Sequence, residues 1–149
     1  MEELHGVIEF FSDSPEATEK IGAKLAKALG EQRFVAFYGT LGAGKTAFIR
    51  GMASVLCPAA PVQSPTYTII NEYKKDKRTA MVHVDAYRVN DEDDLYSTGF
   101  FDYLDSGAVL VIEWSENIID FIGDEEIITV DIKRLGDSER EITVERGEG

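Results

Sequence analysis

The apolar residues of segment 12–30 recur at helical spacing, and the segment carries helix signals at both ends. Ser14 is a residue type that caps helix N-termini, and Pro15 suits the first helical position. Gly30 is typical of the position just after a helix. Residues 45–56 form a second segment of the same kind. The first part of the chain therefore predicts two amphipathic helices.

Elsewhere the apolar residues come in short runs, which indicate strands. The expected strands are residues 7–12, 33–39, 66–75, 78–87, 108–114, 126–135 and 140–147. A short helix and a loop are expected over 91–104, and another short helix over 115–122. Residues 66–75 and 78–87 are joined by a polar turn, and the last two strands flank Gly136, so each pair predicts a β-hairpin. Residues 108–114 are the most continuous apolar run, which predicts a central strand buried on both faces.

This order of strands and helices predicts an α/β fold. We expect a mixed sheet with a parallel centre and antiparallel hairpin additions, and helices on both faces. The chain has 149 residues and contains neither a repeat nor a linker-like tract. A chain of this length has room for one core, so we expect a single domain over residues 1–149.

Composition and charge narrow the classes of function. The single cysteine, Cys57, excludes an internal disulfide and fits a reducing compartment. The sequence lacks an apolar run of membrane-spanning length and the layout of a signal peptide, so we expect a cytoplasmic protein with no membrane partner. A net charge of −13 argues against binding nucleic acid unaided, and the basic residues of 74–78 are interpreted as a solvated turn. An acidic surface suits a basic protein partner.

The loop GTLGAGKT, residues 39–46, matches the pattern G-x-x-x-x-G-K-[ST] between a predicted strand and a predicted helix. Its glycines let consecutive backbone N–H groups point inward, and the helix N-terminus adds positive potential, so the loop can hold phosphates. Lys45 would reach the β- and γ-phosphates, and the hydroxyl of Thr46 would bind Mg²⁺. The fold is therefore expected to be P-loop NTPase-like.

A P-loop needs a second Mg²⁺ ligand, usually a carboxylate at the end of a neighbouring strand. The predicted strands offer Asp85 and Glu113. Glu113 follows five apolar residues, which makes its strand the better central candidate. One carboxylate would hold Mg²⁺ and the other would orient water. His83 lies on the same strand face as Asp85, and we expect a partly buried, hydrogen-bonded histidine there rather than a zinc ligand.

Four stretches coincide with the motifs of one family. They are GTLGAGKT (39–46), SPTYTIINEY (64–73), HVDAYR (83–88) and VIEW (111–114). In this order and spacing they resemble the TsaE (YjeE) family, small P-loop ATPases needed for threonylcarbamoyladenosine (t6A) modification of tRNA adenosine 37. SPTYTIINEY and HVDAYR are more specific to this family than the P-loop is.

The resemblance implies roles for the residues at these motif positions. The ATP phosphates would bind to Leu41, Gly42, Ala43, Gly44, Lys45 and Thr46. Thr46 and Glu113 would hold Mg²⁺. The catalytic residues would be Lys45, Asp85 and Glu113, with Asp85 as the second acidic residue essential for hydrolysis.

The resemblance also implies contacts beyond the phosphates. Thr66 would belong to a switch-like loop near the γ-phosphate, and Trp114 would lie close to the nucleotide. Ser14 and Pro15, which begin the first helix, would lie near the base.

The family's ATPase activity is expected to be weak in the isolated protein. The family docks on a complex of two other proteins, TsaB and TsaD, and its ATP hydrolysis supports repeated turnover. It would meet tRNA only through that complex. Two alternatives stay open: a small-molecule P-loop kinase, and a nucleotide-dependent switch with little hydrolysis. The segment 90–105 is acidic and has no arginine, which argues against a kinase lid.

The net charge generates a first prediction. The isolated chain should show negligible tRNA binding in a gel-shift assay, because a charge of −13 repels the phosphate backbone. A tight complex that weakens steeply with added salt would contradict this prediction.

Overall fold

The described residues form one seven-stranded sheet. The computed structural model describes residues 6–30, 33–39, 44–58, 70–87, 89–104, 106–113 and 127–146. The strands are β1 (Val7–Ser12), β2 (Phe34–Tyr38), β3 (Ile70–Lys75), β4 (Arg78–Asp85), β5 (Val109–Glu113), β6 (Ile127–Arg134) and β7 (Arg140–Arg146). Their order in the sheet is β1-β7-β6-β2-β5-β4-β3.

The centre of the sheet is parallel and its two sides are antiparallel. Strands β6, β2, β5 and β4 run parallel to one another, while β3 pairs antiparallel with β4, β7 with β6, and β1 with β7. The predicted mixed sheet is therefore confirmed. Strands β2 and β5 are buried throughout except at their last residue, as expected of central strands covered on both faces.

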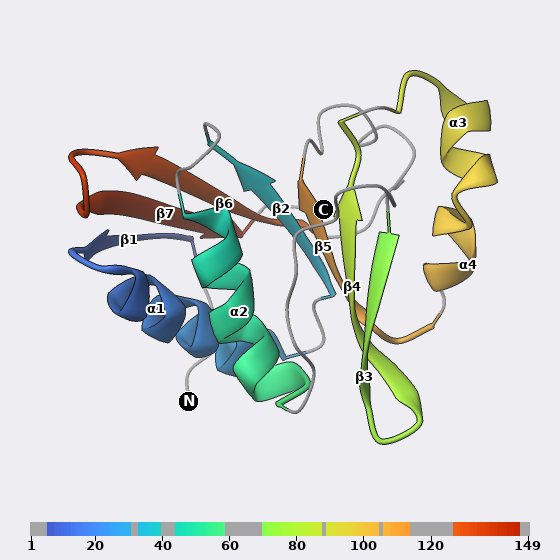
Figure 1. Ribbon diagram of the computed structural model, residues 1–149, viewed down its shortest axis with the longest axis horizontal. Helices are drawn as coiled ribbons and strands as arrows, with labels where there is room; N and C mark the ends of the chain where they lie inside the picture. The colour runs from blue at the N-terminus through green and yellow to red at the C-terminus, as the bar shows by residue number, and fades with distance from the viewer. Residues whose placement is uncertain are drawn as a thin grey trace.

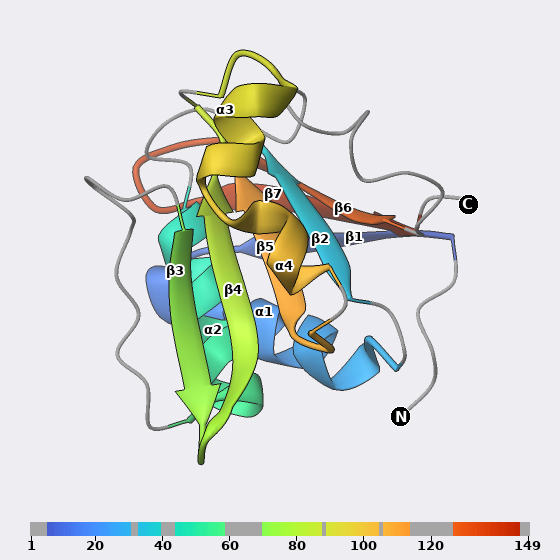
Figure 2. The same ribbon diagram turned by 90° about the vertical axis from the view of Figure 1, so that its right-hand side faces the viewer.

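Helices cover both faces of the sheet. They are α1 (Pro15–Ala28), α2 (Lys45–Leu56), α3 (Glu92–Ser97) and α4 (Phe100–Tyr103). Helices α1 and α2 lie on one face and α3 and α4 on the other (Figures 1 and 2). Two apolar clusters result, a larger one beneath α1 and α2 and a smaller one beneath α3 and α4. None of the described helices is long and apolar enough to cross a membrane.

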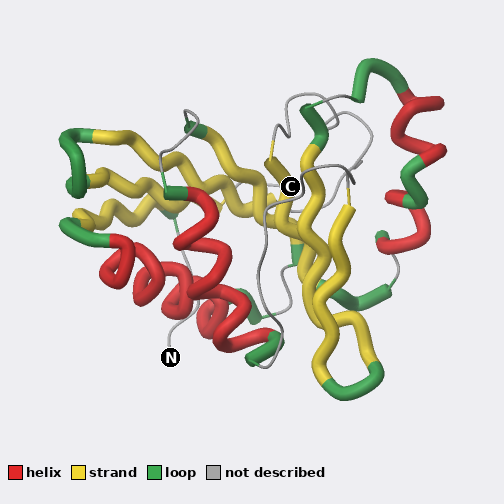
Figure 3. Tube along the Cα trace, in the orientation of Figure 1, coloured by secondary structure: helices red, strands yellow, loops and turns green. Residues whose placement is uncertain are grey.

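Local sequence explains where the helices begin and end. The Oγ of Ser14 accepts a hydrogen bond from the N–H of Ala17 at 3.1 Å, and Pro15 opens α1, as predicted. The segment 91–104 contains two short helices rather than one helix and a loop. Gly99, with φ of 83°, separates them, a conformation that glycine adopts without steric cost (the tube in Figure 3 shows the break).

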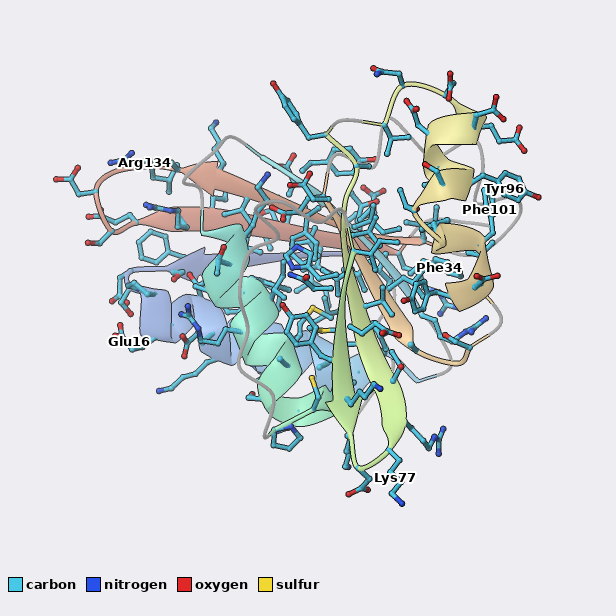
Figure 4. All side chains as sticks on the ribbon, turned by 45° about the vertical axis from the view of Figure 1, so that its right-hand side comes forward. Glu16, Phe34, Lys77, Tyr96, Phe101 and Arg134 are labelled. Atoms are coloured by element: carbon cyan, nitrogen blue, oxygen red, sulfur yellow. The ribbon has the colours of Figure 1, made fainter. Side chains whose placement is uncertain are left out.

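Two predicted elements cannot be compared in full. The first part of the strand expected at 66–75 and the helix expected at 115–122 lie outside the described residues. The basic turn is described, and Lys74, Lys75, Lys77 and Arg78 are exposed there. Figure 4 shows Lys77 at the tip of the β3–β4 hairpin, at the opposite end of the molecule from Arg134.

Helices α1 and α2 cross at two glycines. A Cβ atom at Gly22 would collide with the backbone carbonyl of Phe48, and one at Gly51 would collide with the backbone carbonyl of Glu19. Glycine thus allows the two backbones to approach more closely than side chains permit. An exposed ion pair, Arg50 Nη1 to Glu19 Oε1 at 3.0 Å, joins the helices beside the crossing, where it contributes little stability.

The crossing generates a second prediction. Gly51→Ala should lower the free energy of unfolding by about 1–3 kcal/mol in urea denaturation, since overpacking against backbone cannot be relieved by a rotamer change. Helix propensity alone predicts the opposite sign, a gain of about 1 kcal/mol. Gly136→Ala is the control, because its Cβ would meet only the flexible side chain of Glu139, and it should change stability by less than about 0.5 kcal/mol. A stabilised Gly51→Ala protein would show that the helices do not cross this closely.

Candidate nucleotide site

The described ends of the loop at residues 39–46 have backbone conformations that depend on glycine. Gly39 directly follows β2 with φ of 132°, and Gly44 precedes α2 with φ of 104°. Both angles lie in the region that favours glycine. A Cβ at Gly39 would also crowd the carbonyl of Ile132 on β6. Residues 40–43 between these glycines, which include Leu41, Gly42 and Ala43, lie outside the described residues.

The two predicted carboxylates lie side by side at the edge of the sheet formed by the carboxyl ends of its parallel strands. Asp85 ends β4, Glu113 ends β5, and the two residues are opposite each other in the parallel register. Glu113 is also opposite Phe37, next to the last residue of β2. The backbone N–H of Ala86 donates to the carbonyl of Glu113 at 3.0 Å and continues the pairing past Asp85. The carboxyl ends of parallel strands are where α/β folds bind ligands.

The P-loop lysine reaches this edge. The Nζ of Lys45 donates to the carbonyl of Gly39 at 3.2 Å and lies 3.8 Å from Oε1 of Glu113. The side chains of Lys45 and Glu113 are only 10% and 16% exposed, so their charges attract each other with little screening by water. The structure thus brings together the loop and the carboxylate that the sequence predicted as partners.

A histidine lies behind the carboxylate. His83 is buried on β4, and its Nε2 lies 2.7 Å from Oε2 of Glu113. The sequence predicted a hydrogen-bonded histidine at this position but not its partner. The contact joins residues on neighbouring strands that are two positions out of register, so only the strand pairing reveals it.

The environment of Glu113 favours its ionised form. Burial raises the pKa of this carboxyl, but the hydrogen bond and positive charge of His83 and the charge of Lys45 outweigh burial and hold the pKa below its ordinary value of 4.5. The site therefore presents a carboxylate, rather than a carboxylic acid, at neutral pH.

Asp85 has a different environment. Its Oδ1 accepts a hydrogen bond from the backbone N–H of Tyr87 at 3.0 Å, which fixes the turn after β4. The Tyr87 ring beside it is 60% exposed. Asp85 is thus a partly exposed carboxylate beside Glu113, and the described contacts of the two acids differ.

Sequence reasoning missed a cation beside the P-loop. The Nε of Arg140 lies 3.8 Å from the position that a Cβ at Gly44 would occupy. The Nη1 of Arg140 donates to the carbonyls of Gly136 and Glu139, both at 2.9 Å, so the β6–β7 turn orients this guanidinium. The sequence offers no local signal for this proximity, because Arg140 reaches the loop only through strand pairing.

The remaining predicted residues are placed less fully. Ser14 caps α1 and Pro15 is its first residue. Both follow closely after Ser12, which pairs with Arg140 in the β1–β7 register. The start of α1 therefore lies at the same end of the strands as the β6–β7 turn. Thr66 and Trp114 lie outside the described residues.

The available donors fit a magnesium nucleotide. Thr46 is in the first turn of α2, and Glu113 supplies a carboxylate at the adjoining strand end. Hydroxyl and carboxylate oxygens are ligands that Mg²⁺ prefers, and the ion usually takes its remaining ligands from phosphates and water. Within the described ranges there is no group of three or more His, Cys, Asp and Glu residues suited to a metal ion.

Comparison with known proteins agrees with the motifs. Residues 12–142 match the family model described as "Threonylcarbamoyl adenosine biosynthesis protein TsaE". The chain belongs to the TsaE family. The resemblance predicted from the four motifs is thereby confirmed.

Relatives with TsaE names cover most of the chain. The Bacillus subtilis protein named tRNA threonylcarbamoyladenosine biosynthesis protein TsaE is 41% identical over 131 residues, which are 87% of this chain and 80% of the relative. The Treponema pallidum protein of the same name is 33% identical over 133 residues, 89% of this chain and 96% of the relative. The crystal structure of Bacillus subtilis YdiB matches with a TM-score of 0.69 and 30% identity, covering 97% of this chain and 89% of YdiB.

The pKa of Glu113 generates a third prediction. Because folding lowers this pKa, ionised Glu113 stabilises the fold above about pH 4.5, and the stabilisation is lost as pH falls through the lower folded pKa. Glu113→Gln should therefore be less stable than wild type at pH 7 in urea denaturation, and the difference should shrink below about pH 4.5. The exposed Glu145→Gln on β7 is the matched control. A stability difference that stays constant down to pH 3 would contradict the prediction.

Proposed function

We propose that this chain is the ATP-hydrolysing accessory subunit of tRNA t6A biosynthesis, with residues 1–149 acting as a single P-loop ATPase domain. The convergence of Lys45 and Glu113 at 3.8 Å carries the proposal, because it joins a phosphate-binding loop to a metal-binding carboxylate. Membership of the TsaE family, whose named relatives act in t6A biosynthesis, supports the biological role.

Each proposed catalytic residue has a defined task. When bound, Mg²⁺ would neutralise charge on the β- and γ-phosphates. Thr46 and Glu113 hold the ion, and Lys45 exchanges its contact with Glu113 for one with the phosphates. Asp85, adjacent to Glu113 and partly exposed, acts on the attacking water. Leu41, Gly42, Ala43 and Gly44 hold the phosphates, while Thr66, Trp114, Ser14 and Pro15 remain proposed nucleotide contacts.

The proposed partner is a complex of TsaB and TsaD. A chain of charge −13 is poorly suited to hold tRNA itself, so its ATP cycle acts on proteins that do. The exposed basic residues around Lys77 form only a small group at the tip of the β3–β4 hairpin, away from Arg134 at the end of β6 (Figure 4). Hydrolysis that is weak alone and stimulated by the complex would couple ATP use to turnover.

The kinase alternative lacks support in the described site. A phosphoryl-transfer kinase needs a lid that brings positive charge over the reacting phosphates. Residues 91–102 include five aspartates and glutamates, and the segment 90–105 contains no arginine. Helix α3 presents acidic residues of this segment at the surface. Arg140 is close to the P-loop but belongs to a strand of the central sheet.

A fourth prediction tests the ATPase assignment. Lys45→Ala and Glu113→Ala should each reduce ATP hydrolysis by about 10²–10³-fold, the usual effect of removing a preorganised electrostatic contact to the transition state. Hydrolysis is measured with the chain alone, then with TsaB–TsaD, then with tRNA added. The exposed Lys77→Ala and Glu145→Ala are matched controls and should keep wild-type rates.

Three outcomes would overturn parts of the proposal. Wild-type turnover by Glu113→Ala in the presence of the partner complex would exclude Glu113 as the metal ligand. Transfer of phosphate to a small acceptor would favour a kinase. Tight nucleotide binding with no hydrolysis, even with partners and tRNA, would favour a switch.

A further inference from the structure

The two oxygens of the Glu113 carboxylate have different neighbours. Oε1 lies 3.8 Å from Nζ of Lys45, on the side of the P-loop. Oε2 lies 2.7 Å from Nε2 of His83. In the proposed function Lys45 moves from Glu113 to the phosphates, whereas His83 is buried on β4 with a relative exposure of only 1%. One oxygen therefore faces a partner that can be exchanged, and the other faces a partner that cannot.

The protonation state of the ring follows from this contact. A carboxylate only accepts hydrogen bonds, so Nε2 of His83 must carry the proton. The other ring nitrogen, Nδ1, is buried and has no hydrogen-bond partner within the described residues. The hydrogen bond to Glu113 therefore fixes a proton on Nε2.

We infer that His83 is a positioning residue that holds Oε2 of Glu113 and leaves Oε1 as the single oxygen offered to the divalent cation. This inference rests on the proposed function, in which Glu113 is a metal ligand. His83 touches neither nucleotide nor metal, and it acts only through the orientation of the carboxylate.

The physical benefit is a choice of coordination mode. The terminal torsion of a glutamate is broad, so a carboxylate without an anchor can rotate or offer both oxygens. Mg²⁺ requires near-octahedral geometry at about 2.0–2.1 Å, while Ca²⁺ tolerates bidentate carboxylates and longer bonds. Fixing one oxygen favours the monodentate mode and therefore Mg²⁺ over Ca²⁺. Partners of this kind behind metal ligands typically account for about 10–100-fold in metal affinity.

The test compares two substitutions that differ in one property. His83→Gln places an N–H donor near the position of Nε2, whereas His83→Met fills a similar volume without a donor. Binding of a fluorescent ATP analogue to the full chain is measured across Mg²⁺ concentrations, across Ca²⁺ concentrations, and in EDTA. These equilibrium measurements do not depend on hydrolysis.

The expected result separates positioning from packing. His83→Met should raise the Mg²⁺ concentration at half-saturation by about 10–100-fold, change the Ca²⁺ value less, and leave analogue affinity in EDTA within about two-fold of wild type. His83→Gln should restore most of the Mg²⁺ dependence. The inference is overturned if His83→Met keeps wild-type Mg²⁺ dependence, or if it weakens binding equally with Mg²⁺ and in EDTA.

A second measurement does not require the variants to fold. In the metal-free wild-type protein, ¹⁵N NMR of the imidazole should show the proton of His83 on Nε2, and an Nδ1–H tautomer would overturn the inference. Failure of the proposed function gives a different pattern. Analogue binding by wild type that is indifferent to Mg²⁺, with the Nε2–H tautomer present, would remove Glu113 as a metal ligand while leaving the hydrogen bond intact.

Discussion

The parallel pairing of β2, β5 and β4 is the constraint on which the rest of the site depends. It brings three strand ends to the same edge of the sheet, so that the P-loop after β2, Glu113 on β5 and Asp85 on β4 become neighbours. Because β5 lies between the other two strands, Glu113 is within reach of both Lys45 and His83. A shift of one residue in the β4–β5 register would turn His83 and Asp85 to the opposite face of the sheet.

Much of this arrangement follows from local sequence. Continuous apolar runs identify β2 and β5, the P-loop pattern lies between a strand and a helix, and Ser14 with Pro15 locates the start of α1. An acidic residue that follows a buried apolar run can be placed at the end of a strand in the same way. Those features were predicted because each is encoded within a few neighbouring residues.

Features that depend on distant residues were not predicted. The sequence predicts a partly buried, hydrogen-bonded His83, which the structure buries fully, but it cannot identify Glu113 as the partner because strand order and register set it. Arg140 is near the P-loop for the same reason, because β6 pairs with β2 and β7 pairs with β6 although both strands are distant from β2 in the sequence. The close approach of α1 and α2 was also not predicted, because a glycine inside a helical pattern lowers helix propensity without indicating which residue it contacts.

The charged groups of the site contact one another. Lys45 lies against Glu113 and the carbonyl of Gly39, and His83 occupies the second carboxylate oxygen. In the proposed function, Lys45 would move from Glu113 to the phosphates, which would leave a largely buried carboxylate short of positive charge. A divalent cation held by Thr46 and Glu113 would supply that charge, so metal and nucleotide would each favour binding of the other.

The crossing of α1 and α2 has a mechanical consequence. At Gly22 and Gly51 each helix backbone lies directly against the other, without side chains that could slide or change rotamer between them. We therefore expect the two helices to move together at this crossing. Because α2 begins at Lys45, within the loop motif of residues 39–46, a displacement of α1 would be transmitted to that motif.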